Sequence, residues 1–424
     1  MALEPKYENA LRRKTCVAGS RPSGYLPGIG RPVATSRPGA RAIRLALWGV
    51  IRLIPIVRPT LFDYESVVDE FRQAWEIGQV TTGRFTRRFE ALVEERLQVE
   101  HAIMVQSCTA GLMLVLKALN LTGEVILPAF TWTATAQAVV WNGLSPVFAD
   151  ITPGSYTLDP QTAARAITPR TAAIMPVNVF GCPPEYEALG RLARDCGLRL
   201  IYDSAQGLGS RFQTADGAWR YSGGFGDAEI FSLSPTKVVS AMEGGLITTH
   251  NDALAGQLRQ MRDYGKTADG QDIAWLGLSA RVPEINAIVG RHSFEKLDSL
   301  LACRHELITA YQAAFKDLRG VTFQQIPPNH RTSGNYFTLF ISDEARASRD
   351  EVHRCLNRRG IQTKKYFFPA LHLQAVYRNL RETYQGRLPL TEAASAQGLA
   401  LPLFSHMTPE MFQQVVNVVL EVLG

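Results

Sequence analysis

Apolar side chains recur every three or four positions in two stretches near the start of the globular part, residues 63–79 and 85–97. They are Val67, Val68, Phe71 and Trp75 in the first stretch, and Phe89, Leu92, Val93 and Leu97 in the second. One apolar face repeated at this spacing is typical of an amphipathic helix. The pattern therefore predicts two helices before the first strand.

Short apolar runs then alternate with longer amphipathic segments. The runs cover residues 102–106, 124–127, 146–149, 172–177, 198–202, 229–233 and 245–249. Helices are expected between them, the clearest over 109–119 and 133–141. Buried strands separated by helices indicate an α/β fold, with a mostly parallel sheet covered on both faces.

The pattern changes near residue 293. A long helical pattern over 291–315 leads to a smaller α+β segment, with strands expected over 334–341 and around residue 363 and a last helix over 409–423. We predict a large domain over 58–292 and a small C-terminal domain over 293–424. No internal repeat is evident.

Residues 1–57 form a basic, irregular leader in this interpretation. The first 60 residues hold 11 Lys and Arg and two acids, so their net charge is +9. Since the whole chain has a net charge of +6, the remaining residues have a net charge of −3. The body therefore gives no sign of nucleic-acid binding. Residues 45–57 are apolar but too short to span a bilayer, and they contain Arg52 and Pro55. A leader packed on the protein's own surface or left irregular is favoured over a peripheral membrane helix.

The composition of the chain and the pattern of its cysteines indicate where in the cell the protein is expected. The chain has 424 residues, enough for two or three domains, with 46% apolar and 20% charged residues. The six cysteines are scattered, so a zinc site or a C-x-x-C redox pair is not expected, and no metal is predicted. Residues 1–40 hold no apolar core of a secretory signal. We expect a cytoplasmic protein with free thiols.

The segment Ser107-Cys108-Thr109-Ala110 lies between a predicted strand and a predicted helix. Small residues at such a turn allow backbone N–H groups at the helix N-terminus to bind a phosphate, and the Thr109 hydroxyl can add a bond. The simpler interpretation is a helix N-cap.

Asp203 follows the apolar run that ends at Tyr202. Acids at the carboxyl ends of parallel strands point into the ligand crevice of α/β sheets. A carboxylate there could pair with a pyridinium nitrogen and keep it protonated, which makes a cofactor ring an electron sink. The alternative is again an N-cap.

Lys237 closes the turn that starts at Phe231, and Glu243-Gly-Gly245 opens the next strand. A lysine that is desolvated in such a turn is of the type that forms Schiff bases, whereas most loop lysines are simply solvated. Trp132 leaves another strand, and an aromatic ring there could stack on a flat cofactor or serve as a core or lid residue. A phosphate turn, a stacking ring, an acid and a lysine at one sheet edge together favour a cofactor site.

Several segments resemble the DegT-type nucleotide-sugar aminotransferases, which depend on pyridoxal 5′-phosphate (PLP) and have the fold-type I architecture. The likeness runs from about residue 58 to the C-terminus. It rests on residues 78–83 with 89–90, on 107–110, 128–134, Asp203-x-x-Gln206, Ser232-x-x-x-x-Lys237 with Glu243-Gly-Gly245, 366–374 and 401–403.

The resemblance implies a role for each matching residue. Lys237 would hold PLP and move the proton, Asp203 would pair with the pyridine nitrogen, and Gln206 would lie near the ring hydroxyl. Trp132 would stack on the ring. The residues expected at the phosphate are Cys108, Thr109 and Ser232. His372 and Tyr366 are weaker candidates for substrate contact. Such enzymes are homodimers with shared active sites.

Two segments depart from the family pattern. Gly277-Leu-Ser279-Ala-Arg281 stands where G-x-N-x-R is common, so Ser279 would reach the partner's phosphate less well or through water. Asn178-Val-Phe180-Gly181 stands where H-x-Y-G is common. These departures concern the substrate and the subunit interface more than the cofactor.

The resemblance implies amino transfer from glutamate or glutamine to a keto-sugar, nucleotide-linked in the family's manner, or to a related keto-cyclitol. A branch that dehydrates sugars carries His where this chain has Lys237. Two alternatives stay open: another fold-type I reaction, such as a lyase or decarboxylase, and a catalytically silent PLP-binding regulator. The sequence does not identify the sugar, the ketone position or the stereochemistry.

Overall fold

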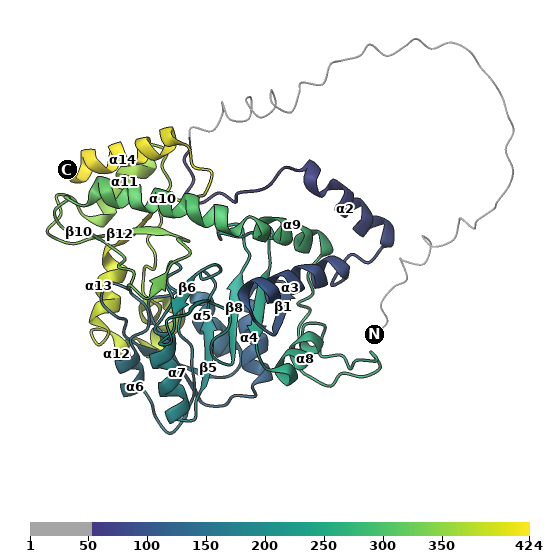
Figure 1. Ribbon diagram of the computed structural model, residues 1–424. Helices are drawn as coiled ribbons and strands as arrows, with labels where there is room; N and C mark the ends of the chain where they lie inside the picture. The colour runs from purple at the N-terminus through teal and green to yellow at the C-terminus, as the bar shows by residue number, and fades with distance from the viewer. Residues whose placement is uncertain (1–52) are drawn as a thin grey trace, which may run out of the picture. The chain divides into compact units, whose positions relative to one another are not determined.

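The computed structural model describes residues 53–424, which form one compact unit (Figure 1). The predicted leader therefore lies outside the described residues except for 53–57. Ile54 and Ile56 are buried, and the backbone of Ile54 bonds to Gly360 and Gln362. In this part of the chain no helix is long and apolar enough to cross a membrane, no cluster of potential metal ligands occurs, and the five cysteines are free.

The helices and strands alternate as the sequence pattern predicts. The helices of the first part are α2 (Glu65–Ile77), α3 (Arg84–Leu97), α4 (Cys108–Ala118), α5 (Thr133–Trp141), α6 (Pro160–Arg165), α7 (Tyr186–Asp195), α8 (Asp252–Met261) and α9 (Glu284–Glu295). The strands of the main sheet are β1 (His101–Val105), β2 (Glu124–Pro128), β3 (Ser145–Ala149), β4 (Thr171–Ile174), β5 (Arg199–Asp203), β8 (Ala228–Ser232) and β9 (Gly245–Thr249).

The main sheet has the order β1-β9-β8-β5-β4-β2-β3. Strand β9 runs antiparallel to both of its neighbours, and the other adjacent pairs are parallel. Side chains alternate between the two faces of a strand. In β1, Ile103 and Val105 join the core under α4, α5 and α8, whereas Ala102 and Met104 join the core under α3 and α9. The expected α/β fold covered on both faces is thus confirmed.

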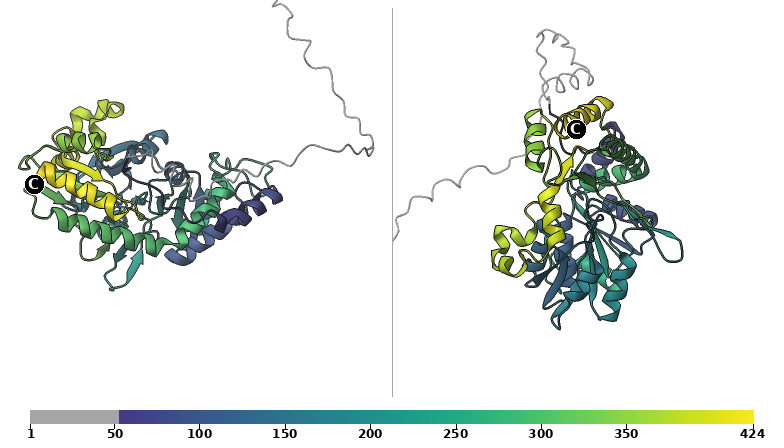
Figure 2. Two further views of the ribbon diagram at one scale, coloured as in Figure 1. Left: turned by 90° about the horizontal axis from the view of Figure 1, so that it is seen from above. Right: turned by 90° about the vertical axis from the view of Figure 1, so that its left-hand side faces the viewer.

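A smaller antiparallel sheet lies in the C-terminal part, built from β10 (Val321–Phe323), β12 (Phe337–Ile341) and β13 (Gly398–Leu401). Its helices are α10 (Leu297–Phe315), α11 (Arg349–Arg358), α12 (Arg378–Tyr384), α13 (Pro389–Gln397) and α14 (Pro409–Leu423), with 3-10 turns at Leu371–Leu373 and Ala375–Tyr377. Figure 2 shows α14 alongside α10. A third sheet joins β6 (Arg211–Gln213), β7 (Trp219–Tyr221) and β11 (His330–Arg331).

Three predicted elements differ from the structure. The long helix over 291–315 was a wrong prediction, because the chain leaves helical geometry at Lys296, with φ −94° and ψ 8°, and this break separates α9 from α10. The strand over 172–177 ends at Ile174, since Pro176 has no N–H to continue the ladder. Around residue 363 the chain forms isolated bridges, such as Lys364 with Ala400, and no strand.

A buried aromatic cluster joins the main sheet to the C-terminal part. Phe130 and Phe180 follow strands of the main sheet, whereas Phe340 and Phe367 belong to the C-terminal part. The ring centres of Phe130 and Phe367 are 5.3 Å apart, and those of Phe180 and Phe367 are 5.5 Å apart. Aromatic pairs at these distances add attraction beyond their buried area.

The start of α3 is capped from a distant helix. Gly83, its N-cap, has no side chain to accept a bond, and the buried carboxylate of Glu284 at the start of α9 does so instead. It accepts bonds from the backbone N–H groups of Gly83 (2.7 Å), Phe85 (2.8 Å) and Thr86 (3.1 Å). One side chain thus satisfies donors that the helix itself leaves open.

Glu284→Ala should therefore lower the free energy of unfolding by about 3 kcal/mol, because it leaves several buried N–H groups without an acceptor. Thermal or denaturant unfolding would measure the loss. Glu295→Ala is the matched control on the same helix, since its carboxylate is 42% exposed and its loss should cost less than about 1 kcal/mol. Equal losses in the two variants would contradict the capping role.

Candidate active site

A cavity of about 310 Å³ opens at the edge of the main sheet where the parallel strands end. Its walls come from the segments after β1, β2 and β4, from the last residues of β5 and β8, and from the turn before β9. Most of the predicted site residues line it: Cys108, Thr109, Trp132, Asp203, Gln206, Ser232, Lys237 and Tyr366. This edge is the usual ligand position in α/β sheets.

The turn before α4 presents a helix N-terminus to the cavity. The Ser107 hydroxyl caps the helix by accepting a bond from the Ala110 N–H (3.1 Å), and the earlier N–H groups have no partner within the helix. Gly245 packs directly on this turn, because a Cβ atom there would lie 2.5 Å from the Ser107 carbonyl carbon. The antiparallel direction of β9 brings its first residue to this edge. The Cys108 thiol points inward, 3.9 Å from the Asp203 Oδ1.

Asp203 is the last residue of β5, and only 3% of its surface is exposed. Its Oδ2 accepts a bond from the Thr135 hydroxyl (2.7 Å), and its Oδ1 accepts one from the Ala205 N–H (3.1 Å). Burial raises the pKa of Asp203, although these two donors and the charge of Lys237 act in the opposite direction. The site therefore holds a buried carboxylate that would gain from a cationic partner.

A second carboxylate lies behind this wall. Glu229 in β8 is fully buried and does not line the cavity. It accepts bonds from the Ser204 hydroxyl (2.7 Å) and from the N–H groups of Gly223 (2.7 Å) and Phe225 (3.0 Å). Burial raises the pKa of Glu229 to about 7, against 4.5 for the free side chain.

This shift makes stability depend on pH. Between about pH 4.5 and 7 the folded chain retains a proton that the unfolded chain releases, so the free energy of unfolding should fall as pH rises through this range, by about 3 kcal/mol in total. Glu229→Gln should remove this part of the pH dependence. Unfolding of both proteins at a series of pH values would test it, and parallel curves would contradict it.

Lys237 lies half-buried in the turn after β8. Its Nζ is 5.8 Å from the centre of the Tyr336 ring, and Tyr336 is buried. Burial is the largest influence on Tyr336 and acts to raise its pKa. The charges of Lys237 and Lys364 and the hydrogen bonds with Thr236 and Tyr366 together outweigh burial, so the pKa is lowered. The charge of Lys237 also acts on Asp203 and Cys108. The lysine therefore faces the interior of the cavity.

Gln206 and Trp132 lie on other walls of the cavity. The Oε1 of Gln206 accepts a bond from the Phe180 N–H (2.7 Å), which fixes the side chain. Trp132 is 57% exposed and meets the ring of Tyr366 edge-on, with 6.4 Å between centres. Its predicted stacking on a cofactor ring stays a prediction.

Two predicted site residues do not line this cavity. Ser279 is exposed on the segment after α8, where its backbone forms an isolated antiparallel β-bridge with Asp263. His372 is fully buried beside Phe148, and its Nε2 lies 3.2 Å from Glu392. Burial lowers the pKa of His372, which favours a neutral structural ring.

The structure adds three residues that sequence reasoning missed: Thr135, Tyr336 and Lys364. Thr135 lies in the first turn of α5 and bonds to Asp203. Tyr336 belongs to a segment whose apolar pattern indicates only a core strand, and Lys364 is one basic residue among many. Nothing in the local sequence distinguishes them, because their role depends on chain segments far away in the sequence.

The groups around the cavity fit those of PLP one by one. Helix N–H groups and hydroxyls suit its phosphate, the buried carboxylate suits a protonated ring nitrogen, and the lysine suits its aldehyde. With the sheet order and the single antiparallel strand, they define a PLP-dependent transferase of fold type I.

The comparison with protein families specifies the class. The sequence model of the DegT/DnrJ/EryC1/StrS aminotransferase family matches residues 63–420, so the chain belongs to this family. It is an aminotransferase, and the family depends on PLP.

Relatives agree with this assignment. The chain is 28% identical over 372 residues to a dTDP-4-amino-4,6-dideoxy-D-glucose transaminase from Escherichia coli, which covers 87% of this chain and 98% of that one. A crystal structure of DesI in the presence of its TDP-sugar product is 32% identical, with a TM-score of 0.80 over 88% of this chain and 95% of that one. The PLP form of a putative sugar aminotransferase from Streptococcus pneumoniae, Spr1654, shares the fold at 23% identity, with a TM-score of 0.78 over 88% of this chain and 100% of that one.

Proposed function

We propose that this aminotransferase moves an amino group from glutamate or glutamine to the ketone of a nucleotide-linked sugar, in amino-sugar biosynthesis. The observation that carries the proposal is the convergence of Lys237, Asp203 and the α4 turn on one cavity. A lysine amine, a buried carboxylate and a phosphate-binding turn are the parts that PLP-dependent transfer requires.

When bound, PLP would supply an electron sink in its ring and a carbonyl carbon that can carry the amino group. The residues of the chain do the rest. The N-terminus of α4, Ser232 and Thr109 would bind the phosphate, and Asp203 would keep the ring nitrogen protonated. The Nζ of Lys237 would carry the proton between the reacting carbons.

The relatives support the choice of acceptor. The E. coli enzyme is a dTDP-4-amino-4,6-dideoxy-D-glucose transaminase, and the structure of DesI was determined in the presence of its TDP-sugar product. A similar acceptor here would place its ketone near Lys237 and its nucleotide toward the open side of the cavity. The free cysteines of the described residues are consistent with a cytoplasmic reaction.

A homodimer with shared sites is the second part of the proposal. Ser279 lies outside its own cavity, and the apolar side chains of Ile273, Trp275 and Leu276 beside it are 57%, 42% and 72% exposed. Exposed apolar groups of this size are typical of surfaces that another chain covers. A partner seated there would receive Ser279 at its own phosphate site.

The first test is the donor half-reaction. The visible absorption of the PLP-loaded protein would be recorded before and after adding glutamate, and then glutamine, without any keto acceptor. Loss of the visible band with one donor supports the proposal, and a set of nucleotide keto-sugars would then identify the acceptor by recovery of the band.

Other outcomes separate the alternatives. A band that neither donor changes would favour a lyase or decarboxylase, or a silent PLP-binding regulator, and amino-acid breakdown without an acceptor would distinguish these. A protein unable to take up PLP would contradict the proposal itself.

A further inference from the structure

A second cavity, of about 360 Å³, adjoins the first. The two share five lining residues, which are Thr131, Trp132, Lys364, Tyr366 and Phe367. The second cavity adds the 51% exposed ring of Phe368, together with His353, Thr363 and Lys365. A molecule that reacts at Lys237 can therefore extend past Lys364 into a space lined by basic and aromatic groups.

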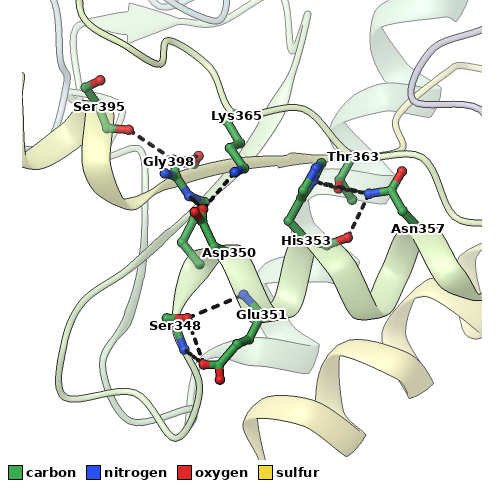
Figure 3. Close-up of polar contacts among 10 residues, drawn as sticks. Ser348, Asp350, Glu351, His353, Asn357, Thr363, Lys365, Ser395 and Gly398 are labelled. Carbon is green, nitrogen blue, oxygen red and sulfur yellow. Dashed lines mark hydrogen bonds and ion pairs between the residues drawn. The ribbon is translucent and has the colours of Figure 1, made fainter.

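Most of the basic groups there are already engaged (Figure 3). The Nζ of Lys365 lies 2.9 Å from the Oδ1 of Asp350, near the start of α11. The Nδ1 of His353 lies 2.7 Å from the Thr363 hydroxyl. Burial, and then the charge of Lys365, lower the pKa of His353, so this ring is neutral near pH 7.

Lys364 differs from these neighbours. No carboxylate within residues 53–424 forms an ion pair with it, and its side chain is exposed at the boundary of the two cavities. Its backbone is fixed by two bonds to Ala400, of 3.2 Å and 2.7 Å. The charges of Lys364 and Lys237 both act on the buried Tyr336, and the Nζ of Lys364 lies 5.9 Å from the centre of the Tyr366 ring.

We propose that Lys364 binds the diphosphate of the nucleotide-linked acceptor and that the second cavity holds the nucleoside. An ammonium group without a carboxylate partner, on a flexible stem, is a common phosphate ligand. The exposed rings of Trp132 and Phe368 offer flat surfaces for a base. This inference rests on the proposed function and selects acceptors by their diphosphate group.

The test is binding of thymidine diphosphate to the PLP-loaded protein, measured by calorimetry without amino donor or sugar. Loaded protein is needed because an empty phosphate turn would also bind the anion. Lys364→Ala should weaken binding at least about tenfold, since a charge-assisted bond to phosphate is lost. Lys117→Ala removes the same charge from an exposed position on α4 and should leave binding unchanged.

The outcomes separate this inference from the proposed function. Equal binding by both variants, or no binding by the unaltered protein, would overturn the role of Lys364. Inorganic pyrophosphate bound as tightly as thymidine diphosphate would overturn the nucleoside position and retain the diphosphate site. The glutamate half-reaction of the unaltered protein, with Lys117→Ala as its control, tests the proposed function separately. Its failure would count against that function, whereas a normal half-reaction without binding of thymidine diphosphate would overturn the role of Lys364 alone.

Discussion

Lys237→Ala should lower the rate of amino transfer by at least about a thousandfold, the largest effect expected of any substitution in this chain. Alanine provides no nitrogen to hold the cofactor or to carry a proton between the reacting carbons. The rest of the cavity should keep its shape, because Lys237 is half-buried in a turn whose backbone bond to Ser234 does not involve the side chain. Rapid mixing of the PLP-loaded protein with glutamate would measure the rate.

The Lys237→Ala variant also tests the alternative that the protein is a catalytically silent PLP-binding regulator. Lys117→Ala is the control for lysine removal and should react at the normal rate. A Lys237→Ala protein that kept a rate within about tenfold of normal would contradict the assigned role. Unchanged biological activity of that protein, together with no reaction in the unaltered one, would favour a regulator.

Asp203→Asn should slow the same reaction by about a hundredfold. The substitution retains the size of the side chain and removes its charge, so a ring nitrogen opposite it would lose the partner that keeps it protonated. Thr135 and Ala205 each donate a hydrogen bond to a different oxygen of Asp203. Asparagine has only one side-chain oxygen, so it can accept only one of these two bonds in the same geometry. A changed absorption spectrum of bound PLP should accompany the slower rate.

Glu229→Gln is the matched control for this effect. Glu229 is a buried carboxylate in the strand next to β5, but its side chain does not line the cavity. Its substitution should change stability with pH and leave the rate within about twofold at pH 8. Comparable loss of rate in both variants would show that burial of charge, and not the position of Asp203, governs the reaction.

The hydrophobic pattern was sufficient for most of the main sheet because its strands are short and most of their residues are apolar and buried. It could not predict β6 and β7, since each of these strands has three residues, too few positions to show a period. It also joined α9 to α10, because the break at Lys296 changes only one residue's conformation and leaves the apolar spacing intact. Strand β9 runs antiparallel for reasons that no local signal contains.

The site was predictable where chemistry follows a strand. Asp203, Ser232 and Lys237 lie at or just beyond strand ends, and sheet topology brings such positions to one edge. His372 was expected near the substrate on resemblance alone, and the structure buries it beside Glu392. Tyr336 reaches the cavity from the C-terminal part, so its role depends on how that part packs against the sheet.

That packing limits how the enzyme can move. One buried cluster contains aromatic rings from both parts of the chain, namely Phe130, Phe180, Phe340 and Phe367. A hinge motion that separated the main sheet from the C-terminal part would therefore break contacts between these rings. Access of the acceptor must then depend on local rearrangement of exposed groups such as Trp132 and Phe368. For the same reason, the main sheet and the C-terminal sheet should melt in one cooperative transition and not as separate units.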